Sequence, residues 1–160
     1  MGCGSYPLFL NNTRFHERYG VDRVKSYGVS DESLTLIEQD IADGAGLPFE
    51  DAFFDVVTLL AVFEHLDLPV LEGLLREIHR VLRPGGVFVM TTPAAWTEAI
   101  LRVMAYLRLV SGEEVGEHKA TYSPGRIVSL LATAGFDSAG VRHGTFEARM
   151  NLWAAARKRV

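Results

Sequence analysis

The sequence has very little cysteine: Cys3 is the sole cysteine among 160 residues. This excludes an internal disulfide framework and a cysteine-rich zinc site, and it fits a reducing cytoplasm. The amino terminus also lacks a basic segment followed by an apolar run and a small-residue cleavage site, so no signal peptide is expected. We therefore expect a cytoplasmic protein without a cysteine-rich metal centre.

Long uncharged apolar runs and excess positive charge are absent as well. The most apolar stretch, residues 94–110, contains Glu98, Arg102 and Arg108, which disfavours a membrane span. A net charge of -4 disfavours binding to nucleic-acid backbones. With 48% hydrophobic residues, the chain fits one domain over residues 1–160 that buries a core of its own.

What is present is an alternation of β-type and helical segments, typical of an α/β fold with a mostly parallel, doubly wound sheet. Apolar patterns predict strands at 16–21, 34–39, 54–60, 87–92, 137–143 and 146–156. The nearly continuous apolar run at 54–60 predicts a central strand covered on both faces. The leucine stripe after Pro69 predicts a helix over 69–82, and Ser123-Pro124 predicts the start of another that Gly135 ends.

A glycine pair opens the chain and an acidic residue follows it. Gly2 and Gly4 allow the backbone to turn sharply and approach a ligand closely, and Asp22 closes the run RYGVD. This spacing favours a nucleotide-binding turn with Asp22 accepting hydrogen bonds from a ribose. The structural alternatives are a plain strand-to-helix turn and an ordinary strand-end acid.

The segments GCGS, GVD, EQDIADGAGLPFEDAFFDVV, FEHL, LREIHRVLRPGGVFVMTTP and AGF stand in the order of class I S-adenosylmethionine-dependent methyltransferases, which the chain resembles over residues 1–92 and 118–136. The resemblance implies a Rossmann-like sheet of order 3-2-1-4-5-7-6 with an antiparallel seventh strand. It implies S-adenosylmethionine as the cofactor and no metal. The implied cofactor-binding residues are Gly2, Cys3, Gly4, Ser5, Asp22, Asp40, Ile41, Leu60, Ala61 and Val62.

Within this set, the resemblance assigns Gly2 to Ser5 to the methionine part of the cofactor and Asp22 to the ribose hydroxyls. Asp40 would hydrogen-bond the adenine amino group beside the apolar Ile41, and residues 60–62 would form a backbone wall. Asp40 has a structural alternative, because an aspartate in this place also caps a loop.

The sequence departs from the family pattern at its start. Met1 directly precedes Gly2, so the family's first strand and the helix before it are missing from these 160 residues. An empty central position would expose two rows of backbone donors and acceptors. We therefore expect either that the sequence is a fragment of a longer protein or an early-started reading frame, or that another segment or another chain, as in a homo-oligomer, fills the position. Pro7 stands where a dinucleotide fingerprint needs glycine, which disfavours a nicotinamide or flavin enzyme.

Three residues are candidates for contact with a substrate. His65 follows the strand at 54–60 at the edge where ligands collect, and His118 and Tyr122 flank a predicted lid or insertion over 94–122. Each has a structural alternative, as a histidine bonded to backbone or as loop residues that tie the lid down. The leading expectation is a methyltransferase acting on a small molecule by direct displacement, and the alternative is an inactive binding or assembly module of the same fold.

Overall fold

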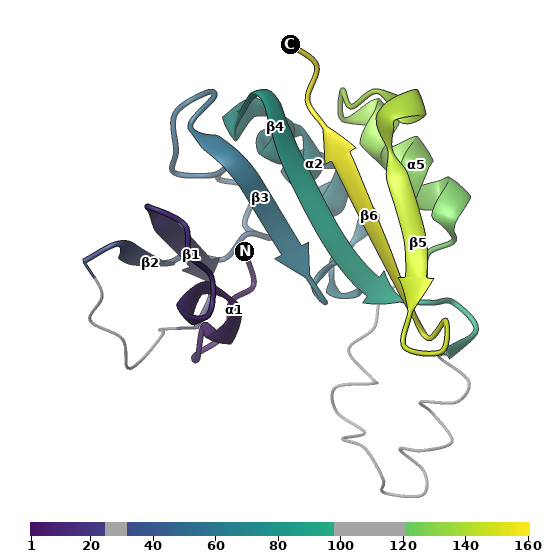
Figure 1. Cartoon of the computed structure of the whole chain (residues 1–160), viewed down its shortest axis with the longest axis horizontal. Helices are drawn as coiled ribbons and strands as arrows, with labels where there is room; N and C mark the ends of the chain where they lie inside the picture. The colour runs from purple at the N-terminus through teal and green to yellow at the C-terminus, as the bar shows by residue number, and fades with distance from the viewer. Residues whose placement is uncertain (25–31, 98–120) are drawn as a thin grey trace, which may run out of the picture.

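The computed structural model describes residues 1–24, 32–97 and 121–160, and its strands form two sheets (Figure 1). In chain order the elements are α1 (Leu8–Asn11), β1 (Arg18–Asp22), β2 (Leu34–Glu38), β3 (Phe54–Leu60), the 3₁₀ turn η1 (Phe63–His65), α2 (Leu68–Val81), β4 (Leu82–Pro93), α5 (Pro124–Thr133), the 3₁₀ turn η2 (Ser138–Gly140), β5 (Arg142–Phe146) and β6 (Asn151–Arg157).

The strand order agrees with the expected topology. One sheet has four strands in the order β3-β4-β6-β5, with β3 and β4 parallel and β6 antiparallel to both of its neighbours. The other sheet is the parallel pair β1-β2. Because β1 faces β3 across Met1 and Gly2, the combined order is β2-β1, one open position, then β3-β4-β6-β5. This is the class I order with the first strand left out, so the expected α/β fold is confirmed.

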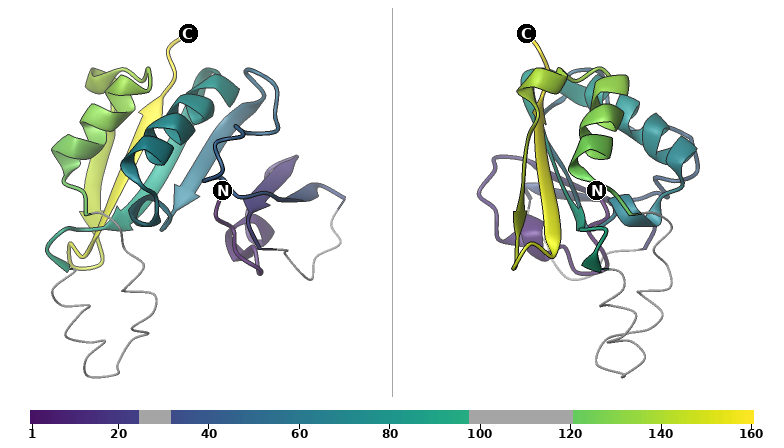
Figure 2. Two further views of the ribbon diagram at one scale, coloured as in Figure 1. Left: turned by 180° about the vertical axis from the view of Figure 1, so that it is seen from behind. Right: turned by 90° about the vertical axis from the view of Figure 1, so that its right-hand side faces the viewer.

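Both long helices cover one face of the four-stranded sheet (Figure 2). The stripe predicted for α2 is buried as Leu71, Leu74, Leu75 and Ile78. The predicted cap of α5 is also present, since the side chain of Ser123 accepts a hydrogen bond from the Arg126 amide at 3.3 Å. These helices and the sheet enclose a core rich in leucine and phenylalanine.

Several strand positions differ from the prediction. The strand expected at 87–92 begins at Leu82, directly after α2, because Leu82 already pairs with Phe54 before a register shift in the ladder. The pair expected at 137–143 and 146–156 lies later, at β5 and β6, since Ser138–Gly140 forms a 3₁₀ turn. The turn between these strands contains residues 147–149, all with left-handed φ values, which apolar patterning does not reveal.

The strand at 54–60 has the predicted bounds but not the predicted neighbours. Within the described residues β3 is the edge of the four-stranded sheet, because no strand lies between it and β1. None of the described helices combines the length and the apolar character needed to cross a membrane.

Candidate functional site

The glycine turn adopts the conformation that its residues predict. Gly2 and Gly4 have φ values of 65° and 66°, in the left-handed region that glycine enters without strain. A Cβ on Gly2 would overlap the side chain of Val62, whereas a Cβ on Gly4 would meet open space. The turn is therefore packed against the end of β3 on one side and open on the other, as a ligand-binding turn requires.

Asp22 lies at the carboxyl end of β1, where it holds this turn. Its Oδ2 accepts a hydrogen bond from the Gly4 amide at 2.8 Å, and its Oδ1 accepts one from the Val24 amide at 2.9 Å. A carboxylate has about four lone-pair directions, so both oxygens retain capacity for a further donor. The predicted pairing of the turn with Asp22 is thus present in space.

Asp40 and Ile41 follow β2 at the same edge. The Gln39 amide donates to the carbonyl oxygen of Asp22 at 2.8 Å, which aligns the two strand ends. Asp40 accepts the Ala42 amide at 2.9 Å, so its loop-capping role is real, and its exposed carboxylate remains open to solvent.

A cavity of about 560 Å³ lies between this loop and α2. Ile41 lines it together with Pro69 and Val70 from the first turn of α2. Glu77 lines it as well and accepts a hydrogen bond from the Leu47 amide at 2.9 Å. The loop carbonyl of Gly46 is fixed in turn by the Gln39 side chain at 2.7 Å. The apolar neighbour expected beside Asp40 therefore borders a hollow of the size of ligand pockets.

Leu60, Ala61 and Val62 form the expected turn after β3. Ala61 has a left-handed φ of 53°, an uncommon value for a residue with a Cβ. The turn is held because the Ala61 amide donates to both the carbonyl oxygen and the hydroxyl of Thr91, at 3.2 and 3.1 Å. Strained turns of this kind cluster at ligand sites.

The candidate substrate neighbours are partly brought together. His65 ends η1, and its amide donates to the Val62 carbonyl oxygen at 3.0 Å. The ring of Tyr122 packs edge-on against Phe63 of the same turn, with centroids 4.9 Å apart. His118 lies outside the described residues, as does most of the predicted lid at 94–122.

The hydroxyl of Tyr122 is buried and accepts or donates no hydrogen bond within the described part of the chain. Burial raises the pKa of Tyr122; the positive charge of Arg126 opposes this rise, while the carboxylates of Glu64 and Asp67 add to it. The phenol is therefore neutral at physiological pH, able to donate a proton in a hydrogen bond.

Glu64 is a candidate that the sequence analysis did not select. Its side chain is 3% exposed, and its Oε2 accepts a hydrogen bond from the hydroxyl of Thr92, itself 1% exposed, at 2.9 Å. The sequence signal was its position beside His65 in FEHL, directly after β3. A buried carboxylate at the carboxyl edge of a parallel sheet is chemically uncommon and marks a functional candidate.

The fit to a nucleoside cofactor can be judged from these contacts. An open glycine turn, a strand-end carboxylate and an apolar wall lie at one edge of the two sheets, which suits the donors and acceptors of S-adenosylmethionine. Within the described ranges, no cluster of three or more His, Cys, Asp or Glu side chains is arranged to hold a metal ion.

A family model described as "Methyltransferase domain" matches residues 1–90, more than half of the chain. The chain belongs to the class I S-adenosylmethionine-dependent methyltransferases. It is 31% identical over 150 residues to malonyl-[acyl-carrier protein] O-methyltransferase of Dechloromonas aromatica, covering 90% of this chain and 53% of that protein. It is 34% identical over 134 residues to sterol 24-C-methyltransferase of Candida albicans, covering 73% of this chain and 33% of that protein.

Solved structures of this methyltransferase class show the same fold. An S-adenosylmethionine-dependent methyltransferase of Mesorhizobium loti gives a TM-score of 0.73 at 17% identity, covering 98% of this chain and 88% of that one. A putative methyltransferase of Haloferax volcanii, solved in complex with the activator Trm112, gives a TM-score of 0.71 at 16% identity. The match covers 99% of this chain and 80% of that one. The chain spans about half the length, or less, of the two curated relatives named above.

Proposed function

We propose that this methyltransferase domain binds S-adenosylmethionine at the edge formed by the glycine turn and the ends of β1, β2 and β3, and transfers its methyl group to a small-molecule acceptor. One observation carries the proposal: Asp22 holds the Gly4 amide at 2.8 Å, while the turn stays open above Gly4. A turn fixed in this way offers backbone donors and a carboxylate to one nucleoside.

The proposed roles follow the positions of the residues. Gly2, Cys3, Gly4 and Ser5 border the methionine part, and Asp22 accepts hydrogen bonds from the ribose hydroxyls. Asp40 binds the adenine amino group, and Ile41 contacts the adenine ring from the hollow beside α2. Leu60, Ala61 and Val62 form the wall opposite the turn, with Val62 already against Gly2.

The bound cofactor supplies a methyl group made reactive by the positive charge on its sulfur. What the protein contributes is alignment of the acceptor, worth roughly 7 to 11 kcal/mol in well-oriented reactions, and removal of a proton where the acceptor carries one. We propose His65 and His118 as candidate bases for this proton and Tyr122 as a hydrogen-bond donor to the acceptor. The malonyl and sterol acceptors named for the relatives leave the acceptor class of this domain open.

Calorimetric titration with S-adenosylhomocysteine tests the cofactor site. Asp22→Ala removes a charged acceptor, so we expect binding to weaken by about tenfold to a hundredfold. Asp137→Ala is the control, because Asp137 also accepts a local amide, that of Ala139 at 3.2 Å, and it precedes η2, outside the proposed cofactor site. Equal affinities for wild type and Asp22→Ala would remove Asp22 from the site.

The second candidate is a binding or assembly module of the same fold without activity. The observation that favours it is that both carboxylate oxygens of Asp22 already accept backbone amides, from Gly4 and Val24. Failure of the folded chain to bind either S-adenosylmethionine or S-adenosylhomocysteine would favour this alternative. A cytoplasmic location is also part of our proposal, and imaging of the tagged protein in its host cell would test it.

A further inference from the structure

The connection between β2 and β3, residues 39–53, is held by two side chains of α2. Glu77 accepts a hydrogen bond from the Leu47 amide at 2.9 Å, and Arg80 donates one to the Leu47 carbonyl oxygen at 3.1 Å. Both backbone groups of the buried Leu47 are therefore bound by side chains from a helix far away in the sequence. We call the pair Glu77 and Arg80 the α2 clamp.

The guanidinium group of Arg80 is fully engaged in this clamp. It carries its N–H donors in a planar fork. They reach both carboxylate oxygens of Glu77 at 2.9 and 2.7 Å, the carbonyl oxygens of Leu47 and Phe49 at 3.1 and 2.9 Å, and the carboxylate of Asp51 at 2.8 Å. The hydrogen bonds from Arg80 lower the pKa of the Glu77 carboxyl, so the two partners are both charged. A two-pronged charged pair of this kind fixes geometry as well as adding energy.

A chain of contacts leads from the α2 clamp to the acidic residues of the proposed cofactor site. Gly46 directly precedes Leu47, and its carbonyl oxygen accepts a hydrogen bond from the Gln39 side chain at 2.7 Å. Gln39 directly precedes Asp40, and its amide donates to the carbonyl oxygen of Asp22 at 2.8 Å. The stretch that begins with Asp40 is thus a loop with its two ends joined and with its far end bound to α2. Contiguous networks of this kind can carry coupling between separated groups.

The close approach of this loop to the α2 clamp depends on glycine. Gly46 has a φ of 79°, and a Cβ on it would lie 2.9 Å from a carboxylate oxygen of Glu77, closer than carbon and oxygen normally approach. The side chain of Glu77 also lines the hollow that Ile41 lines. The width of the hollow beside Ile41 therefore depends on the distance between loop and helix, which the α2 clamp fixes.

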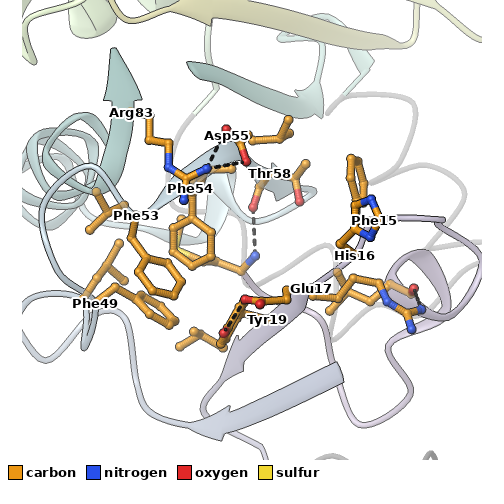
Figure 3. Close-up of a pocket in the computed structure, with 18 of the residues that line it drawn as sticks. Phe15, His16, Glu17, Tyr19, Phe49, Phe53, Phe54, Asp55, Thr58 and Arg83 are labelled. Carbon is orange, nitrogen blue, oxygen red and sulfur yellow. Dashed lines mark hydrogen bonds and ion pairs between the residues drawn. The ribbon is translucent and has the colours of Figure 1, made fainter. Parts of the chain in front are cut away.

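The α2 clamp also reaches β1 through an aromatic contact. Arg80 holds the carbonyl oxygen of Phe49, and the Phe49 ring packs edge-on against the ring of Tyr19 on β1, with centroids 5.6 Å apart (Figure 3). β1 ends at Asp22. The strand that presents this acidic residue therefore rests on a residue that the α2 clamp holds.

We propose that Glu77 and Arg80 are positioning residues that make the cofactor site selective for adenine over a purine with oxygen in place of the amino group. They hold the loop where Asp40 faces the amino group and Ile41 faces the ring of the base. The inference rests on the proposed function, from which it takes these two contacts. The α2 clamp acts on the base through the loop and not by touching the cofactor.

Calorimetric titration with S-adenosylhomocysteine and with S-inosylhomocysteine tests the proposal. The second ligand carries a carbonyl oxygen where the first carries the amino group, so it cannot donate to Asp40. We expect the wild-type chain to prefer the adenosine ligand by about tenfold to a hundredfold. Arg80→Met keeps an apolar stem and removes every donor of the guanidinium group, so we expect this preference to fall by about fivefold to tenfold.

Arg83→Met is the matched control. Arg83 also bonds an aspartate and a backbone carbonyl oxygen, those of Asp55 at 3.0 Å and Ala52 at 3.3 Å, but it does so at the start of β3 (Figure 3). We expect this variant to keep the wild-type preference. Glu77→Gln retains an acceptor for the Leu47 amide and should keep more of the preference than Glu77→Ala, which separates the hydrogen bond from a general loss of stability.

The proposal is overturned if Arg80→Met and Glu77→Ala, both folded by circular dichroism, keep the wild-type preference. An equal fall in Arg83→Met would overturn it too, because general support of the connection would then explain the change. Should Arg80→Met and Glu77→Ala not fold, Glu77→Gln must itself lower the preference, and no change would count against the proposal in the same way. Each of these results leaves the proposed function standing, whereas a wild-type chain that binds neither ligand would overturn both.

Discussion

Two regions of this domain differ in how their apolar residues are covered. The two-stranded region comprises α1, β1, β2 and the segments that connect them, and the four-stranded region comprises β3 to β6 with the helices that cover them. The core cluster runs from Leu47 to Ala156 and includes no residue of β1, β2 or α1, although Val21 of β1 is buried outside it. The two-stranded region instead exposes Leu8 at 69%, Phe15 at 49% and Phe9 at 45%. The stable core thus lies in one region, while the glycine turn and Asp22 lie in the other.

Ordering by a bound ligand would therefore act mainly on the two-stranded region. Regions with few buried apolar contacts open at low free energy, and functional segments are drawn from such regions. Binding of a cofactor at the turn would tie the two-stranded region to the four-stranded region.

The largest effect is expected in the four-stranded core. Phe88 is fully buried and its ring stacks on Phe136 with centroids 6.0 Å apart, so Phe88→Ala should lower the free energy of unfolding by about 3 to 5 kcal/mol. Leu36→Ala on the half-buried β2 should lower it by less than about 2 kcal/mol. Denaturant titration measures both, and equal losses would contradict the comparison.

A smaller effect is expected from the buried polar pair. Thr92→Val leaves the buried carboxylate of Glu64 without its donor and should destabilise the domain by about 1 to 3 kcal/mol. Thr92→Ser keeps the hydroxyl and serves as the control. In the two-stranded region, Ser33→Ala removes one bond to Arg18, at 2.6 Å, but Arg18 keeps its bond to the Leu10 carbonyl oxygen at 2.8 Å. If Ser33→Ala lowered the free energy of unfolding as much as Thr92→Val, the expected difference between the two regions would be contradicted.

The smallest effect concerns pH. Burial depresses the pKa of the Met1 amino group in the folded chain below its ordinary value of about 8. The unfolded chain then binds more protons in the interval between the two pKa values, so stability should rise as pH increases from the folded pKa toward about 8 and should be lowest, and constant, below the folded pKa. Acetylation of the amino group removes this titration, so the stability difference between acetylated and free chains should shrink as pH rises. A difference independent of pH would contradict the burial of this charge.

Much of the fold follows from local pattern. The leucine stripe and Pro69 place α2 within one residue, and the apolar run at 54–60 matches β3 in full. The start of β4 could not be predicted, because Leu82 joins the strand only through its pairing with Phe54. The contact of Lys158 could not be predicted either: its ammonium group donates to the carbonyl oxygens of His79 and Leu82, both at 2.8 Å, because β6 brings it to the end of α2.

The candidate site was predictable where it depends on short motifs and not where it depends on register. Gly4 and Asp22 contact each other as their spacing indicated, because the glycine turn lies at the carboxyl end of β1, which Asp22 closes. The bond between Glu64 and Thr92 joins residues 28 positions apart and follows from the pairing of β3 with β4. Sequence patterns carry little information on such a contact, so Glu64 was not selected.

The most direct test of the account is an NMR titration of the ¹⁵N-labelled chain with S-adenosylhomocysteine. We expect saturable shifts at the amides of Gly2, Gly4, Asp22, Ile41 and Val62, with little change along β5 and β6. Saturable binding that leaves these five amides unmoved, or a folded chain that shows no binding, would contradict the claim that the glycine turn and Asp22 hold one nucleoside.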